Sequence, residues 1–128
     1  MRTFSRLFRR LFQKGETRSD APSARSQQAV LAHLDGTTLP DEVYQQHDLA
    51  TIEDRLIEVL AAADAGEFDG NEIGPTETTL FMYGEDAERL FSSIEPVLRA
   101  YPLCRNARIE IRRGGPGAPQ RELRLPPA

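Results

Sequence analysis

Hydrophobic residues recur with a helical period in three parts of the chain. In residues 1–14, Phe and Leu lie at i, i+3, i+4, i+7 and i+8 with Arg on the other side, which predicts a short basic amphipathic helix. A second stripe predicts a helix over 49–65 that Asp48 or Thr51 can cap and Gly66 can end. A third predicts a helix over 86–101 that is bent at Pro96.

Shorter apolar runs predict the strands. Residues 67–73 and 78–83 read as a hairpin, and residues 107–113 and 121–125 alternate as a half-buried antiparallel hairpin with charged outer faces. The run 78–83 is apolar on both faces, which predicts a buried central strand with Phe81 and Tyr83 in the core. Residues 29–34 are too short to separate a strand from a helical turn, and residues 35–47 look irregular.

The order of these elements predicts an α+β fold. It matches the split β-α-β-β-α-β pattern of ferredoxin-like two-layer sandwiches, with one added C-terminal strand. We expect two helices on an antiparallel sheet of four to five strands, plus a separate N-terminal amphipathic helix. The domain organisation is then a basic helix at 1–14, a flexible linker at 15–28 that spans roughly 20 Å, and a domain at 29–128.

Composition is that of one small soluble domain. The chain has 128 residues and a single cysteine, Cys104, so it forms no internal disulfide and fits a reducing compartment. No run of apolar residues is long enough for a membrane span, and Arg6, Arg9 and Arg10 interrupt the only segment that resembles a signal peptide. We therefore expect a cytoplasmic protein that its first helix can hold at a membrane surface.

Charge is arranged in blocks that the net charge of −4 hides. Residues 1–25 contain 7 basic and 2 acidic residues, residues 35–95 contain 2 and 16, and residues 99–128 contain 7 and 2. The three blocks carry +5, −14 and +5. A partner or a membrane responds to the charge of the block that it meets, so the blocks are more informative than the sum.

Lysine is nearly absent. Fifteen of the 16 basic residues are Arg, and Lys14 lies in the N-terminal helix. The domain therefore has no lysine for a Schiff base, and the chain contains no phosphate-binding loop of the G-x-x-x-x-G-K-[ST] type. The sequence predicts no catalytic residue, no cofactor and no metal site.

The N-terminal helix is the strongest functional feature. Its Arg face and apolar face suit an interface with an anionic membrane, and several basic groups at about 1 kcal/mol each give reversible attachment. A transit peptide, docking on a partner or on the acidic domain of the same chain, and the absence of any role are the alternatives. The residues concerned are Phe4, Leu7, Phe8, Leu11 and Phe12, with Arg6, Arg9 and Arg10 on the polar face.

A second cluster combines carboxylates with turn residues. Oxygen ligands at this density can hold Ca²⁺ or Mg²⁺, but the spacing does not fit an EF-hand, since Gly70 as the sixth residue puts Ala65 first. A turn or bulge with positive φ at Gly70 and Gly74 is the simpler interpretation. As an acidic interaction site, the cluster consists of Asp64, Glu67, Asp69, Asn71 and Glu72.

Other residues give weaker signals. His33 and His47 can form a base or metal pair with Asp48 or Glu53, although neither lies in a metal-binding motif, and surface or capping roles are simpler. Cys104, Ser92 and Ser93 lack a catalytic context and read as structural. The C-terminal Arg block suggests RNA binding, but the strands lack the necessary aromatic run and the acidic block repels phosphate, so we do not expect nucleic acid as a partner.

Part of the sequence resembles a known group of proteins. The segments Phe68-Asp69-Gly70-Asn71-Glu72-Ile73-Gly74, Leu80–Phe91 and Ile94-Glu95-Pro96-Val97-Leu98 look like a family of small uncharacterised bacterial proteins. The similarity covers residues 29–125 and leaves the basic N-terminal segment outside. Because the family has no assigned activity, the resemblance implies no cofactor and no catalytic residue.

These observations lead to one main hypothesis and one alternative. The main hypothesis is a non-enzymatic protein-binding or regulatory domain of the acidic immunity or inhibitor type, with a basic protein as its partner. The alternative is a small enzyme of unknown substrate that works through His47 and the carboxylates of residues 69–72.

Overall fold

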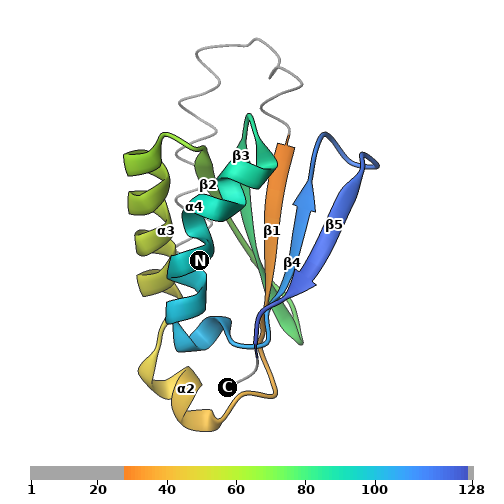
Figure 1. Cartoon of the computed structure of the whole chain (residues 1–128). Helices are drawn as coiled ribbons and strands as arrows, with labels where there is room; N and C mark the ends of the chain where they lie inside the picture. Colours follow the sequence, from red (N-terminus) through yellow and green to blue (C-terminus); the bar gives the residue numbers. More distant parts are fainter. Residues whose placement is uncertain (1–27, 127–128) are drawn as a thin grey trace.

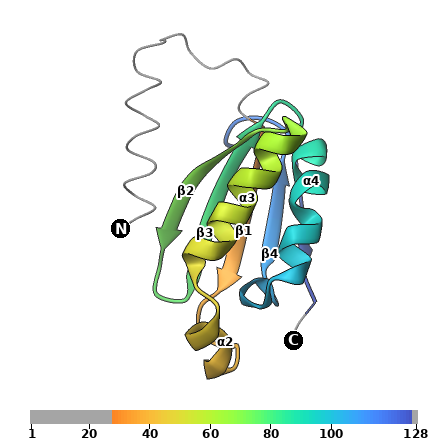
Figure 2. The same ribbon diagram turned by 90° about the vertical axis from the view of Figure 1, so that its left-hand side faces the viewer.

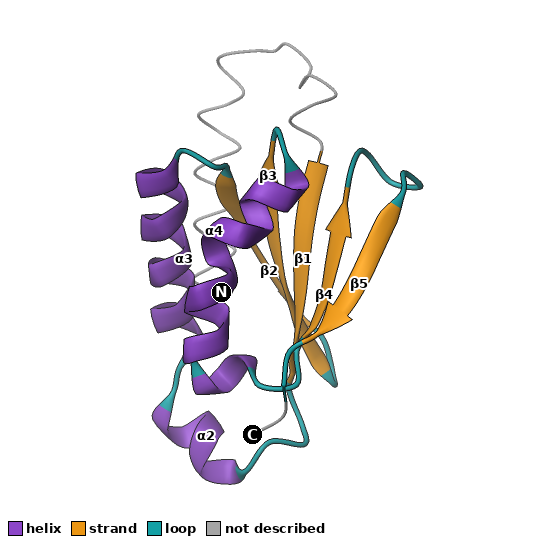
Figure 3. Cartoon of the chain, in the orientation of Figure 1, coloured by secondary structure: helices purple, strands orange, loops and turns teal. Residues whose placement is uncertain are grey.

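A computed structural model of the chain describes residues 28–126. The elements are β1 (Gln28–Asp35), α2 (Asp41–Gln46), α3 (Leu49–Ala63), β2 (Glu67–Ile73), β3 (Glu77–Gly84), α4 (Ala87–Ala100), the 3-10 helix η2 (Pro102–Cys104), β4 (Arg108–Arg112) and β5 (Gln120–Arg124). In this part of the chain the fold is α+β, with an open antiparallel sheet of five strands and three α-helices (Figures 1 and 3).

The strands lie in the order β2-β3-β1-β4-β5. Strand β1 is central and pairs antiparallel with β3 on one side and with β4 on the other. The hairpins β2-β3 and β4-β5 add the outer strands. Residues 28–35 are thus a strand, which decides the choice that the short apolar run left open.

Alternation along the strands creates two different faces. One face packs under α3 and α4, which lie on the same side of the sheet (Figure 2). The opposite face is covered by no helix of residues 28–126, and we call it the open face. The strand residues that the core buries are Val30, Ala32, Leu34, Phe68, Leu80, Met82, Ile109 and Ile111.

The two long helices begin where the sequence predicts. The Asp48 carboxylate caps α3 by accepting from the Thr51 N–H at 3.0 Å, and Asp86 caps α4 by accepting from the N–H groups of Glu88 and Arg89. Helix α4 runs through Pro96, as predicted, and ends at Ala100 before Pro102.

The end of α3 differs from the prediction. The helix stops at Ala63, because Asp64 and not Gly66 takes the left-handed cap conformation, with φ of 52°. Gly66 is needed for another reason: a Cβ there would lie 2.2 Å from the Tyr83 carbonyl oxygen. The turn after α3 therefore passes directly against the end of β3.

A short helix was not anticipated. Residues 41–46 form α2, where the sequence suggests only an irregular stretch. The helix has six residues and buries only Val43, so it is too short to show a periodic stripe. Pro40 followed by two acidic residues is its only local signal.

The expected bulge is present in β2. The register shifts between Phe68 and Gly70, and Gly70 has φ of 114°. The expectation of a positive φ at Gly74 is wrong, because among the described glycines only Gly66, Gly70 and Gly117 have one.

The prediction that Phe81 and Tyr83 lie in the core is also wrong. Strand β3 buries Leu80 and Met82 against the helices, and Phe81 and Tyr83 point to the open face, where they are half-buried. Their position follows from the alternation in β3, since its apolar residues occupy both faces while helices cover only one.

Two expectations concern the membrane. The predicted N-terminal amphipathic helix and the linker before Gln28 lie outside the described residues. Among residues 28–126, no helix has the length and apolar character needed to cross a membrane.

The turn after β1 is held by one carboxylate. Asp35 accepts from the N–H groups of Thr37 and Thr38 at 3.0 and 2.9 Å, from the Thr38 hydroxyl, and from the Asn106 amide at 3.0 Å. Partial burial alone would raise the pKa of Asp35, but these hydrogen bonds, that of the Thr38 hydroxyl foremost, outweigh burial and hold the pKa well below its usual range. Asp35 therefore links the β1 turn to the chain before β4.

We expect Asp35→Asn to lower the free energy of unfolding by about 1–3 kcal/mol at neutral pH, because hydrogen bonds to a charged group are lost. A lowered pKa stabilises the fold fully above the ordinary carboxyl pKa of about 4, and this contribution is lost as the pH falls further. Urea unfolding of the wild type and of Asp35→Asn at about pH 7 and about pH 3 measures the difference in their free energy of unfolding. This difference should be smaller at the lower pH. An equal difference at both pH values would contradict the role of the Asp35 charge.

Candidate functional site

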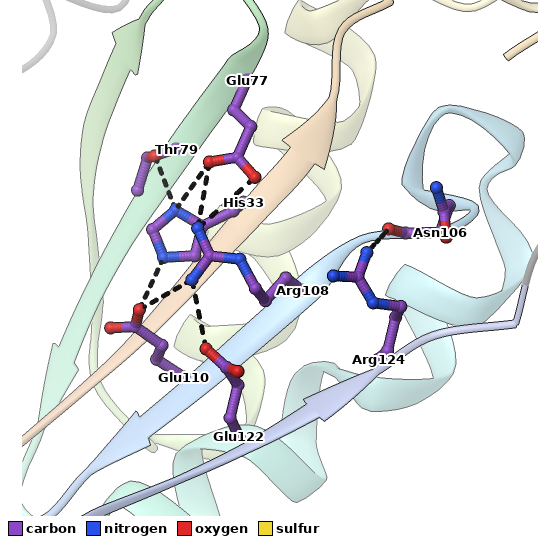
Figure 4. A network of polar contacts seen from close by, with 8 residues as sticks. All are labelled: His33, Glu77, Thr79, Asn106, Arg108, Glu110, Glu122 and Arg124. Atoms are coloured by element: carbon purple, nitrogen blue, oxygen red, sulfur yellow. Dashed lines mark hydrogen bonds and ion pairs between the residues drawn. The ribbon is translucent and has the colours of Figure 1, made fainter. Parts of the chain in front are cut away.

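The open face carries a polar cluster near the end of β1. The register places His33 opposite Thr79 on one side and opposite Arg108 on the other, and it places Asp35 opposite Glu77. Glu110 and Glu122 face each other across the β4-β5 hairpin. Four strands thus contribute to what we call the His33 cluster, shown in Figure 4, which consists of His33, Glu77, Thr79, Arg108, Glu110 and Glu122.

Arg108 is the centre of this cluster. Its guanidinium lies 3.0 Å from Glu77 Oε1, 3.1 Å from Glu110 Oε2 and 3.1 Å from Glu122 Oε2. One cation thus bridges three carboxylates from three strands (Figure 4). Because three negative charges surround one positive charge, the cluster holds an excess of negative charge that a further cation can offset.

His33 lies between two of these carboxylates. Its side chain is only 11 % exposed, and Nδ1 lies 2.8 Å from the Thr79 hydroxyl and 3.9 Å from Glu77 Oε1. Nε2 lies 3.2 Å from Glu110 Oε2, but the oxygen is off the direction in which a ring N–H points, so no hydrogen bond forms. The imidazole is thus held at Nδ1 by the Thr79 hydroxyl, whereas Nε2 is buried without a hydrogen-bond partner.

A shallow depression of about 170 Å³ lies beside the cluster. Its walls carry carboxylates, an amide and a guanidinium, so a small polar molecule would find both donors and acceptors there. The lining residues are His33, Asp35, Thr76, Glu77, Asn106 and Arg124. Within the described part of the chain, no three His, Cys, Asp or Glu side chains are arranged to hold a metal ion.

The predicted acidic interaction site does not converge on one point. Asp64 caps α3, and its carbonyl accepts from Arg89 at 3.0 Å. On β2, Asn71 lies opposite Leu80 on the helix side and donates to Glu53. Glu67 and Glu72 lie opposite Tyr83 and Thr79 and therefore on the open face, and Asp69 lies at the bulge between them. The five residues are thus divided between the two faces.

The two histidines are on opposite sides of the sheet. His33 belongs to the open face, whereas the His47 ring packs edge-on against Tyr101 with 5.4 Å between ring centroids. Tyr101 follows α4 and donates to the Asp48 carbonyl at 2.8 Å, on the helix side. Residues 69–72 belong to edge strand β2, which packs under α3. The structure therefore groups His47 with Tyr101 and Asp48.

Glu53 is a buried carboxylate that the sequence reading did not single out. Its residue is 0 % exposed on α3, and it accepts a hydrogen bond from the Asn71 side chain. The sequence does indicate that Glu53 is buried, because it follows Leu49 by four residues and so lies on the apolar face of the helix. The contact ties α3 to edge strand β2.

The terminal basic block is largely engaged within the domain. Arg121 contacts both carboxylate oxygens of Glu88 at 2.8 Å, and Arg113 contacts the same carboxylate at 3.3 Å. The hydrogen bonds from Arg121 first, and then those from Arg113, hold the pKa of Glu88 at about 2 against the opposite effect of partial burial. Part of the positive block is thus paired with the acidic block inside one molecule.

Cys104 and the serine pair have structural positions. Cys104 is completely buried, and burial raises the pKa of its thiol to about 12, so it is protonated and unreactive. The hydroxyls of Ser92 and Ser93 donate to the Arg89 carbonyl in the preceding turn of α4.

Comparison of the chain with protein-family models, with curated proteins and with solved structures gives no significant match. This result is consistent with the resemblance to small bacterial proteins that have no assigned activity. The role of the surfaces must therefore be argued from their own residues.

We expect Arg108→Ala to destabilise the domain by about 1–2 kcal/mol, between the values for exposed and buried ion pairs, because three carboxylates lose their shared cation. Urea unfolding near neutral pH measures this loss. Adding Glu110→Gln and Glu122→Gln to Arg108→Ala should restore part of the stability by removing the repulsion.

The matched control is Arg124→Ala on the neighbouring strand. Arg124 is exposed and donates only to the Asn106 carbonyl, so its removal should cost less than about 0.5 kcal/mol. If Arg108→Ala costs no more than this control, Arg108 does not hold the cluster together.

Proposed function

We propose that this chain is a non-enzymatic protein-binding domain that receives a basic partner on the acidic surface of α2 and α3. The observation that carries the proposal is the distribution of charge on these helices. Residues 41–64 contain seven acidic residues and one basic residue, Arg55. Six of these acidic residues are exposed, and we call them the acidic helical surface: Asp41, Glu42, Asp48, Asp54, Glu58 and Asp64.

Acidic residues in other parts of the described chain lie beside arginines. The acidic residues Glu77, Glu88 and Glu95 are bound by Arg side chains of the C-terminal part of the chain. Within residues 41–64 the one basic residue, Arg55, lies over the Tyr101 ring at 5.3 Å from its centre. Acidic residues thus outnumber basic residues seven to one in the segment that contains α2 and α3, which in Figure 1 follow each other directly.

A surface of this kind suits fast recognition of a basic protein. Complementary charge raises the association rate and disfavours acidic competitors. An acidic domain of about 100 residues that neutralises a basic partner acts in the manner of immunity or inhibitor proteins. We extend the proposal to this class, with the cytoplasm as its location.

The topology supports a ferredoxin-like fold for this binding domain. Helix α3 connects β1 to β2 with β3 between them, and α4 connects β3 to β4 with β1 between them. Two such split units form the β-α-β-β-α-β pattern. Strand β5 is then an addition at the β4 edge, and α2 is an insertion before α3.

A small enzyme is the second candidate, and the observation that favours it is the His33 cluster. A largely buried imidazole between Glu77 and Glu110 beside a polar depression is an arrangement that suits proton transfer. This candidate site differs from the one that the sequence suggested, which combined His47 with the carboxylates of residues 69–72.

The charge proposal predicts the behaviour of the double variant Asp54→Asn, Glu58→Gln. In affinity capture with the immobilised full chain, the proteins retained should be more basic than the input. Retention should fall about tenfold in the variant and also when salt rises from about 50 mM to about 300 mM, because both weaken a charged interface. Quantitative mass spectrometry of the retained proteins measures both effects.

The matched control is Glu95→Gln, Glu122→Gln, which removes the same charge from α4 and β5. This control should retain the partner as the wild type does, and His33→Gln should do the same. The proposal is overturned if the retained proteins are no more basic than the input, or if both double variants behave alike. Loss of retention in His33→Gln alone would also overturn the proposal, because the partner would then bind at the His33 cluster.

A further inference from the structure

The open face has an apolar half beside its polar half. Leu31 lies directly opposite Phe81, and Ala29 lies opposite Tyr83, so these residues of β1 and β3 are neighbours on one face. All of them except Ala29 keep part of their surface exposed. We call Leu31, Phe81 and Tyr83 the apolar patch. Covering such a patch stabilises a complex, because large aromatic side chains leave water.

Carboxylates border the apolar patch. Glu67 lies opposite Tyr83 on β2, and Glu110 lies opposite Leu31 on β4. Burial raises the pKa of the Tyr83 hydroxyl, and nearby Asp69 raises it further against the opposite effect of Arg112. Arg108 is paired with Glu110, and Arg112 lies opposite Ala29, so the carboxylates of the rim outnumber its arginines by three to two. A ligand that is apolar on one side and basic on the other fits this surface.

The chain itself contains a segment of this chemistry. Residues 4–12 alternate Phe and Leu with Arg at a helical period and contain no acidic residue. Their three Phe and two Leu match an aromatic patch, and Arg6, Arg9 and Arg10 match an acidic rim.

Connectivity places this segment near the patch. The described chain enters the sheet at Gln28, three residues before Leu31 in the same strand, which is a distance of about 10 Å. Fifteen residues, 13–27, join the segment to β1 and reach up to about 50 Å when extended. A tethered segment meets its site at an effective concentration in the millimolar range, so even a weak contact is populated.

We propose that residues 4–12 dock on the open face of their own domain, with Phe and Leu on the apolar patch and Arg toward the carboxylates of its rim. This contact uses a different surface from the acidic helical surface and does not depend on the proposed function. In this contact the N-terminal basic block, residues 1–25, meets carboxylates of the acidic block, residues 35–95. Because only three side chains form the patch, the contact is reversible.

Paramagnetic relaxation measured by NMR on the full chain tests this contact. A spin label attached to Ser5→Cys reports where the segment lies, and native Cys104 does not react because it is buried and protonated. The amide signals of Leu31, Phe81 and Tyr83 should be strongly broadened, while those of the exposed side of α3 should not. Phe8→Ser with Leu11→Ser should abolish the broadening, whereas Gln13→Ser, on the polar face, should preserve it.

Three outcomes would overturn the proposal. The first is uniform or absent broadening of the domain signals. The second is broadening that appears only when labelled chain is mixed with isotope-labelled chain, since the contact would then join two copies. The third is an absence of open-face contact in buffer together with binding of the segment to phosphatidylglycerol vesicles, which would assign it to a membrane. The Phe8→Ser, Leu11→Ser variant changes no residue of the domain, so a failure of the domain to fold does not confuse the result.

Discussion

Antiparallel pairing of β1 with both β3 and β4 is the constraint on which the rest of the structure depends. The pairing fixes which residues of the three inner strands face the helices and which face away. A slip of one residue in β1 would exchange Val30, Ala32 and Leu34 for Leu31, His33 and Asp35, so burial of the first set fixes the register strongly. The same register that builds the core therefore assembles the open face, with the apolar patch near the start of β1 and the His33 cluster near its end.

Charge is distributed according to this architecture. The C-terminal hairpin brings Arg108, Arg113 and Arg121 to Glu77 and Glu88 of the acidic block, so two blocks that the sequence separates are partly neutralised within one domain. Helices α2 and α3, which carry several exposed acidic residues, lie away from the hairpin. The domain therefore presents two different surfaces, an acidic one on the helices and an apolar one with carboxylates at its rim on the sheet.

Sequence patterns predicted much of the fold and little of the site. The stripes of α3 and α4 and the alternation of β4 are long enough to define their elements, and capping carboxylates at Asp48 and Asp86 mark the helix starts. Helix α2 was missed because six residues show no period, and Phe81 and Tyr83 were misplaced because an apolar residue in a strand does not reveal which face is covered. The acidic cluster of residues 64–72 divides between two faces because β2 alternates and bulges at Gly70.

The sequence by itself determined the class of fold, the boundaries of α3 and α4 to within two residues, and the three charge blocks, because each depends on local periodicity or composition. Only the tertiary structure decided that His33 meets Glu77, Glu110 and Arg108, that His47 lies on the other side of the sheet, and that Glu88 binds the terminal arginines. Those contacts join residues separated by tens of positions, and strand pairing, which local patterns do not encode, is what brings them together.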